Sequence, residues 1–159
     1  MKMTERVDIE APAEFVFGEL SDFPTIERLA IQRGVALRRA DRLDERRAGM
    51  AWIADWEFGG RKRRTNLTLT RYEPPRRMVL ASETSGIAAE IEIEVVPLAA
   101  TASRVLIETQ MTAESMAAKL LLQTVRLGRA AFEGRIRGRL SNLAARVEQR
   151  YAASTGGAA

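Results

Sequence analysis

The sequence predicts an α+β fold in which a curved antiparallel sheet of about seven strands surrounds a long C-terminal helix, with two short helices after the first strand. Three observations predict it. Apolar residues alternate with a period of two over most of residues 3–111, turn signals separate the alternating runs, and the period becomes helical after Thr112. The chain has 159 residues with no internal repeat and no linker, so we expect one domain over residues 1–151.

The first strand is expected at residues 3–10, where apolar and charged residues alternate. Pro12 suits the first position of a helix, and Glu14 complements the helix dipole in the first turn. The stretch at residues 21–24 ends this short helix. A second short helix is expected from about residue 25 to residue 30.

From residue 35 onward the period of two returns and predicts six more strands. They are expected near residues 35–42, 49–58, 61–72, 77–84, 87–97 and 103–111. Gly59-Gly60 is typical of a two-residue hairpin turn, and Pro74-Pro75 and residues 97–102 mark two further hairpins. Consecutive hairpins give an antiparallel sheet, whose apolar face needs a helix to cover it.

The long helix is expected to begin at Thr112 or Ser115, either of which can cap it, and to end at about Tyr151. Gly128 predicts a bend or a break within it. The small and Gly-rich residues 152–159 are predicted to form a disordered tail.

The chain has neither cysteine nor histidine, which excludes several classes of function. Disulfides, thiolate catalysis, Ser–His–Asp arrangements and cysteine-based metal sites cannot be built. The sequence also lacks an Asp-rich loop of the calcium-binding type. We therefore expect no metal, no cofactor and no catalytic residue of a common kind.

The 25 basic and 21 acidic residues give a net charge of +4. Only Lys2, Lys62 and Lys119 are lysines, and this preference for Arg indicates GC-rich coding and hence a bacterial source. The N-terminus shows no apolar segment typical of a signal peptide, and no run approaches the roughly 20 apolar residues of a membrane span. A cytoplasmic location is therefore expected.

The order of elements resembles the START-like (SRPBCC) superfamily, the polyketide cyclase/dehydrase and lipid transport group. Local similarity lies in residues 7–17, where a strand runs into a helix through Ala-Pro-Ala-Glu, in the Pro-Pro turn of residues 72–80, and in residues 140–143 of the last helix. The pattern covers nearly the whole chain. It implies the helix-grip fold, with an apolar cavity for a small molecule between the sheet and the C-terminal helix. It transfers no catalytic residue, because the superfamily has no shared catalytic motif.

The hairpin register can be derived from the glycine turn. A two-residue turn there pairs positions whose numbers sum to 119, so Asp55 faces Arg64 and Glu57 faces Lys62. These two pairs of opposite charge share one face. The other face carries the aromatic residues Trp52, Trp56 and Phe58. Because both tryptophans lie on it, this second face should be the concave one.

Arg63 is the sharpest candidate for ligand binding, since it pairs with Trp56 on the predicted concave face. A guanidinium beside an indole at the rim of an apolar cavity could hold a carboxylate or phenolate head group. The alternative is that Arg63 extends past the sheet edge into solvent and binds nothing specific.

Apolar residues of the strands, and Phe132 of the long helix, are further candidates for lining the cavity, and they fit plain core packing equally well. They are Trp52, Trp56, Phe58, Leu67, Leu80, Ile91, Ile93, Ile107, Met111 and Phe132. Gly128 and Gly134 either leave room for a ligand or let the helix bend. Candidates for acid–base chemistry are Asp55, Glu57, Tyr72, Glu83 and Tyr151, but no two carboxylates are placed together in the predicted cavity, since Asp55 and Glu57 are expected on the outer face.

Basic residues do not predict a nucleic-acid partner. On a strand, Arg61 to Arg64 alternate between faces, and no aromatic residues interleave with them as in a base-stacking platform. The long helix carries many arginines: Arg126, Arg129, Arg135, Arg137, Arg139, Arg146 and Arg150. With Glu133 placed to pair with Arg137, a solvated face is the default interpretation, and docking to an acidic partner is the alternative.

Three functions fit these observations. The leading hypothesis is a protein that binds or carries a hydrophobic or lipid-like small molecule. The second is a polyketide cyclase or aromatase-like enzyme that acts by folding its substrate in the same cavity. The third is a protein-interaction module that uses the Arg-rich helix, and a homodimer is compatible with each.

Overall fold

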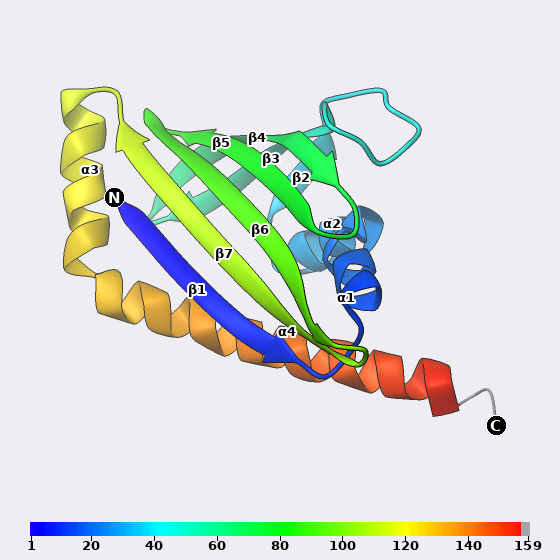
Figure 1. Ribbon diagram of the computed structural model, residues 1–159. Helices are drawn as coiled ribbons and strands as arrows, with labels where there is room; N and C mark the ends of the chain where they lie inside the picture. The colour runs from blue at the N-terminus through cyan, green and yellow to red at the C-terminus, as the bar shows by residue number, and fades with distance from the viewer. Residues whose placement is uncertain (157–159) are drawn as a thin grey trace.

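Seven antiparallel strands form one curved sheet, and four helices lie around it, in the computed structural model, which describes residues 1–156 (Figure 1). The strands are β1 (Lys2–Ile9), β2 (Ala36–Arg39), β3 (Ala51–Phe58), β4 (Arg61–Glu73), β5 (Arg77–Thr84), β6 (Ile87–Ala99) and β7 (Ala102–Ala113). Their order in the sheet is β1-β7-β6-β5-β4-β3-β2, so β1 and β2 are the two edges. The predicted fold class, with seven strands and two short helices after the first, is confirmed.

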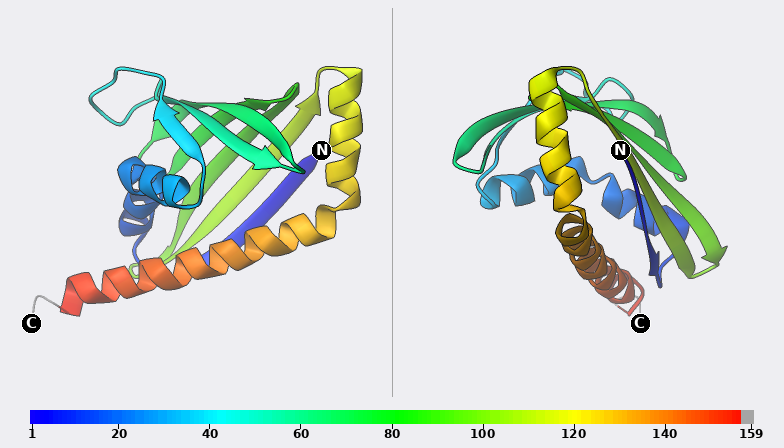
Figure 2. Two further views of the ribbon diagram at one scale, coloured as in Figure 1. Left: turned by 180° about the vertical axis from the view of Figure 1, so that it is seen from behind. Right: turned by 90° about the vertical axis from the view of Figure 1, so that its left-hand side faces the viewer.

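Two irregularities in the long strands accompany the curvature. The β4–β5 pairing shifts register between Leu69 and Arg71, and the β6–β7 pairing shifts between Pro97 and Ala99. An extra residue in one strand of a pair increases the local twist and bends the strand. The sheet therefore has a concave inner face, toward which the helices lie (Figure 2).

The hairpin between β3 and β4 forms as the glycine turn predicts. Gly59 and Gly60 both have positive φ, at 60° and 76°, a backbone that side chains disfavour. Asp55 lies opposite Arg64, and the guanidinium donates two hydrogen bonds to the carboxylate at 2.8 and 3.1 Å. Glu57 lies opposite Lys62 as expected, although these two make no ion pair in the part of the chain that the structure describes.

Two helices follow β1: α1 (Ala13–Leu20) and α2 (Phe23–Gln32). The second helix is longer than expected at both ends. The physical reason at its start is Asp22, whose carboxylate accepts hydrogen bonds from the Thr25 amide at 3.4 Å and from the Thr25 hydroxyl at 2.7 Å. This cap moves the helix start back to Phe23.

The C-terminal helix breaks at Gly128, as the sequence predicts, into α3 (Met116–Leu127) and α4 (Arg129–Gly156). Of the two candidate caps, Ser115 is the one used, since its hydroxyl accepts a hydrogen bond from the Ala118 amide at 3.1 Å. The two helices meet at a sharp corner, and α3 stands against the ends of β6 and β7 (Figure 2).

Two expectations about α4 are corrected. Residues 152–156 continue the helix rather than beginning a disordered tail, because the Ser154 and Thr155 hydroxyls donate to the Tyr151 carbonyl at 2.8 and 3.2 Å and satisfy an acceptor near the helix end. The last three residues of the expected tail lie outside the described residues. Glu133 pairs with Arg129 at 2.6 Å, one turn before it, and not with Arg137, whose side chain donates to the Glu133 carbonyl instead.

The apolar core fills one end of the grip, where α1 and α4 lie against the sheet. Leu140, Ala144 and Val147 form the buried stripe of α4, at intervals of four and three residues. This helix contacts β1 and α1, so it covers the β1 edge of the inner face and leaves the β3 and β4 part uncovered by α4 (Figures 1 and 2). A hollow therefore remains at the other side of the molecule.

Candidate functional site

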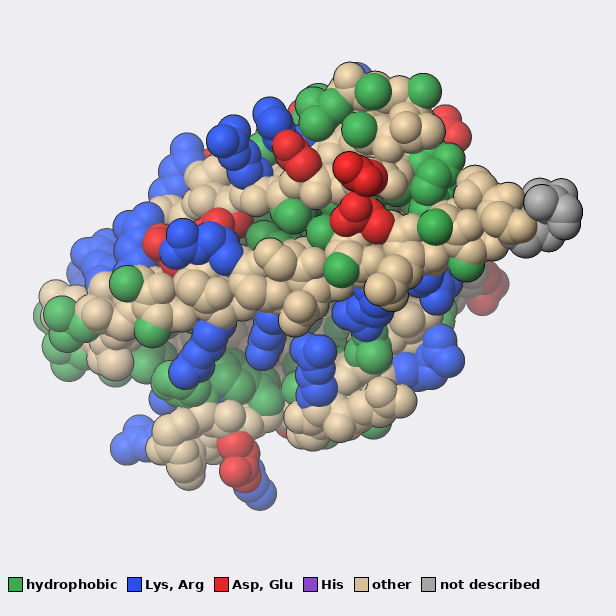
Figure 3. Space-filling model, turned by 90° about the horizontal axis from the view of Figure 1, so that it is seen from below, with side chains coloured by type: hydrophobic (Ala, Val, Ile, Leu, Met, Phe, Trp, Pro, Cys, Tyr) green, Lys and Arg blue, Asp and Glu red, His purple; other side chains and the backbone are tan. Residues whose placement is uncertain are grey.

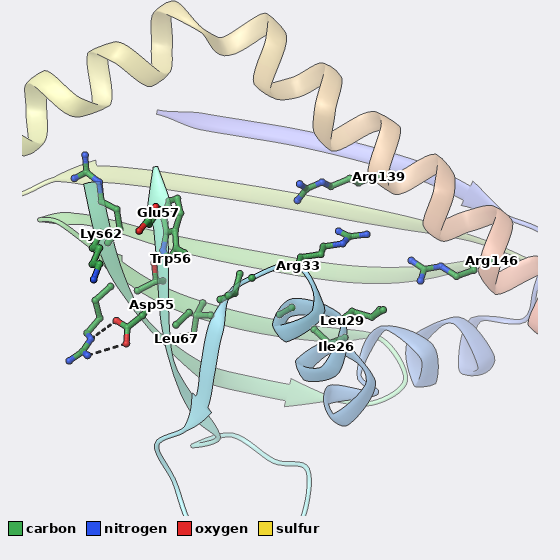
Figure 4. A pocket seen from close by; sticks show the side chains of 17 residues that line it. Ile26, Leu29, Arg33, Asp55, Trp56, Glu57, Lys62, Leu67, Arg139 and Arg146 are labelled. Carbon is green, nitrogen blue, oxygen red and sulfur yellow. Dashed lines mark hydrogen bonds and ion pairs between the residues drawn. The ribbon is translucent and has the colours of Figure 1, made fainter. Parts of the chain in front are cut away.

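An open cavity of about 1380 Å³ lies between α2, the β3–β4 hairpin and α4 (Figure 4). It reaches both faces of the hairpin, since residues of both alternating phases of β3 and β4 line it. Its lining residues are Ile26, Leu29, Ala30, Arg33, Gly34, Val35, Ala54, Asp55, Trp56, Glu57, Lys62, Arg63, Arg64, Thr65, Leu67, Arg139 and Arg146. The cavity is therefore built from three parts of the chain that are far apart in sequence.

The apolar part of the lining comes from α2 and the sheet. Ile26 and Leu29 are on one side, and Trp56 and Leu67 are on the other. The Trp56 indole is held in place, because its Nε1 donates to the Thr65 hydroxyl at 2.9 Å. That hydroxyl in turn shares a hydrogen bond of 2.7 Å with the Thr84 hydroxyl. A fixed aromatic side chain presents contact area to a ligand at low entropic cost.

The charged part of the lining is mostly basic, with six basic and two acidic side chains. Asp55 is one of the two acids, and its hydrogen bonds with Arg64 hold the pKa of its carboxyl below the ordinary value (Figure 4). Arg63 of β4 donates to the hydroxyl of Ser85, in the turn after β5, at 3.0 Å. Figure 3 shows a row of basic side chains along one flank of the long helix, over a hollow with apolar side chains in it. The cavity thus favours anions on electrostatic grounds.

The other candidates for acid–base chemistry lie elsewhere. Tyr72 packs against Phe17 with ring centres 5.7 Å apart, and Tyr151 packs against Phe15 at 5.2 Å. Glu83 accepts a hydrogen bond from the Gly86 amide in the β5–β6 turn. Within residues 1–156, no group of three or more acidic side chains could hold a metal ion. The cavity thus combines apolar contact surface with an excess of basic side chains.

Three of the predicted site residues, Trp56, Arg63 and Leu67, line the cavity together. Trp52 does not: only 5% of it is exposed, its Nε1 donates to Glu27 at 2.8 Å, and it packs in the core. Phe58 is 53% exposed beside the hairpin turn, and Phe132 is 42% exposed on α4. These last two are surface residues rather than parts of this cavity.

The remaining predicted residues share the inner face of the sheet but lie outside this cavity. They are Leu80, Ile91, Ile93, Ile107 and Met111, all of them half-buried. The register places Leu80 opposite Ile91 and Ile93 opposite Ile107, so they form an apolar band across β5, β6 and β7. Contact of any of these residues with a ligand stays a prediction.

Sequence reasoning missed the residues that α2 and α4 contribute, above all Arg33, Arg139 and Arg146. One signal was present: Arg139 and Arg146 are seven residues apart, about two helical turns, so they share a face. Which way that face points depends on how α4 is rotated against β1, and this is set by tertiary packing.

A model of the polyketide cyclase / dehydrase and lipid transport family matches residues 1–148. The match spans most of the chain, and the chain therefore belongs to this family. No curated protein sequence matches it.

Solved structures share the fold at low identity. An aromatase/cyclase, ZhuI from Streptomyces sp. R1128, is 14% identical over 94% of each chain, with a TM-score of 0.66. A START superfamily protein from Mycobacterium smegmatis is 16% identical, with 86% of this chain and 97% of that chain covered and a TM-score of 0.54. A norcoclaurine synthase from Thalictrum flavum is 10% identical over 94% of this chain and 95% of that chain, with a TM-score of 0.67. None of the helices in residues 1–156 has the length and hydropathy needed to cross a membrane.

Proposed function

We propose that this protein binds and carries a hydrophobic or lipid-like small molecule in the cavity between α2, the sheet and α4. The observation that carries the proposal is the cavity itself, whose volume of about 1380 Å³ exceeds the ~300–1,000 Å³ of ordinary ligand sites. The apolar part of its lining and the family of the chain support the same conclusion. A ligand of this kind would cover inner-face side chains that α4 leaves partly exposed.

The positions of the acidic side chains favour carriage over a cyclase that uses acid–base groups. Asp55 accepts a hydrogen bond from Arg64. Glu57, two residues further along β3, lies on the same outer face of the strand. A cyclase that only folds its substrate would need no such group. Genome context separates the two functions, since a cyclase gene should lie beside a polyketide synthase gene.

The two tryptophans provide the test, because Trp56 lines the cavity and Trp52 is in the core. In the Trp52→Phe variant, Trp56 is the only tryptophan, and its fluorescence should change on titration with a neutral amphiphile such as dodecanol. In the matched Trp56→Phe variant, Trp52 should report little change. Native mass spectrometry of freshly purified protein then identifies any ligand carried from the cell.

Equal responses from the two variants would contradict a binding site at this cavity. No response from either variant to dodecanol or to a charged amphiphile of the same chain length, together with no co-purified molecule, would contradict the proposed function as a whole.

A further inference from the structure

We propose that Arg33, Arg139 and Arg146 form an anion clamp, which holds the carboxylate or phosphate of an anionic amphiphile at the mouth of the cavity. This inference rests on the proposed function, since it names the ligand class of the same cavity. The ligand would be an apolar body that carries one such anionic group.

The first step is the position of the two arginines of α4. Arg139 directly precedes Leu140, and Arg146 directly precedes Val147. Leu140 and Val147 are only 7% and 1% exposed, because they belong to the buried stripe of the helix. Both arginines therefore flank the same side of that stripe. They line the cavity, and Figure 4 shows their side chains reaching from α4 toward the other lining residues.

The second step is Arg33, which approaches from the opposite wall. It is the C-cap of α2, and its amide donates to the carbonyls of Leu29 and Ala30 at 3.2 and 3.1 Å, so its backbone is fixed at the helix end. Figure 4 shows its side chain extending from α2 toward α4. A favourable interaction with the helix dipole would by itself explain an arginine at the C-terminal end of α2. It would not explain two further arginines that face this one across a cavity.

The third step concerns charge. In the described part of the chain, Arg33, Arg139 and Arg146 make no ion pair with a carboxylate, whereas Arg150 of the same helix pairs with Glu19 at 3.0 Å. Three guanidinium groups around one hollow repel one another. An anion between them would remove this repulsion, and the planar guanidinium matches both carboxylate and phosphate geometry.

The fourth step is the apolar surface beside the clamp. Ile26 and Leu29 line the cavity on the same helix as Arg33, and Trp56 and Leu67 line it from the sheet. An amphiphile with its charge at the clamp can therefore place its apolar body against these side chains. A small inorganic anion would leave that surface uncovered, and a neutral lipid would leave the arginines unpaired.

The experiment compares four probes with one chain length and different head groups: dodecanoate, dodecyl phosphate, dodecanol and dodecyltrimethylammonium. Binding to the full chain is measured by calorimetry, below the critical micelle concentration of each probe. We expect the better of the two anions to bind at least tenfold more tightly than dodecanol, and the cation to bind most weakly. The anion that binds more tightly tells whether the clamp holds a carboxylate or a phosphate.

Variants connect the effect to the clamp. The double variant Arg139→Gln/Arg146→Gln should bind the anionic probe roughly 10- to 100-fold more weakly than the natural chain does. Its affinity for dodecanol should change less than about twofold. The single variant Arg33→Gln should bind the anionic probe roughly 3- to 10-fold more weakly. The matched control is Arg137→Gln, which removes the same charge from α4 at a position that does not line the cavity. It should leave anion binding within about twofold.

The outcomes separate the two proposals. If the double variant holds dodecanoate and dodecyl phosphate as tightly as the natural chain does, the clamp is overturned and the carrier function stands, whether or not dodecanol binds. If none of the four probes binds the natural chain, the carrier function is overturned, and the clamp with it. Circular dichroism and thermal unfolding of each variant check the fold. We expect it to be intact, because all three arginines are exposed.

Discussion

The two ends of the inner face of the sheet use the same alternating pattern for different purposes. At the end near α1 and α4, residues such as Leu69, Val105 and Val147 are at most 1% exposed and form the core. At the end near the β3–β4 hairpin, residues of the same face border the cavity. The difference follows from the path of α4, which lies over the β1 edge. One end stabilises the fold, and the other is left available for a ligand.

The largest expected effect comes from two leucines of β4 that share one face and lie two residues apart. Leu69→Ala should lower the free energy of unfolding by about 3–5 kcal/mol, because Leu69 is 0% exposed and the change leaves a hole in packed core. Leu67→Ala, at the cavity, should cost about 1 kcal/mol, because this side chain already borders open space. Urea unfolding measures both. Equal losses would remove the distinction between the two ends.

An intermediate effect is expected at Asp41, in the loop between β2 and β3. Its carboxylate accepts hydrogen bonds from Arg39 at 2.8 Å, from the Leu43 amide at 2.9 Å and from the Ala51 amide at 2.7 Å. The same Arg39 lies over the ring of Trp52, 5.7 Å from its centre. Asp41→Asn should therefore lower the free energy of unfolding by about 1–2 kcal/mol at neutral pH.

The pH dependence gives an independent check of Asp41. The hydrogen bond from Arg39 is the main cause that holds the pKa of this carboxyl well below its ordinary value. A lowered pKa in the folded state means that the stabilisation is fully present above the unfolded pKa of about 3.9 and is lost as the pH falls below it. The natural chain should therefore lose more stability than Asp41→Asn between pH 5 and pH 2. Parallel stability curves for the two proteins would contradict this.

The smallest effect is expected at Gly134 of α4. A Cβ there would meet no atom within 4 Å, so Gly134→Ala should raise the free energy of unfolding by about 0.5–1 kcal/mol through lower backbone entropy of the unfolded chain. It should not change ligand affinity, because Gly134 does not line the cavity. Weaker ligand binding in this variant would instead support the hypothesis that Gly134 leaves room for a ligand. Gly138→Ala, with equally open space, serves as the replicate.

Much of the fold could be predicted because its signals are local. The glycine turn between β3 and β4 requires positive φ at two successive residues, and this alone sets the register that places Asp55 opposite Arg64. The break of the last helix at Gly128 and its cap at Ser115 likewise depend on residues close in sequence. In the site, the same register correctly brought Trp56, Arg63 and Leu67 to one surface.

The rest of the site could not be predicted from the alternation of apolar and polar residues. This pattern shows on which face of the sheet a residue lies, but it does not show what covers that face. Trp52 and Trp56 are the same residue type on the same face of β3, yet Trp52 packs against Phe23 at 5.2 Å and Trp56 lines the cavity. The position of α2 decides between these two outcomes.

The sequence by itself thus determined the strands, the hairpin register, the break in the last helix and the inner face of the sheet. Only the tertiary structure decided where that face is filled and where it is hollow, and which arginines of α4 point into the hollow. The physical reason is that the rotation of α4 is set by burying Leu140, Ala144 and Val147 against distant elements. An arginine's role in the cavity therefore depends on contacts that its own sequence neighbours do not specify.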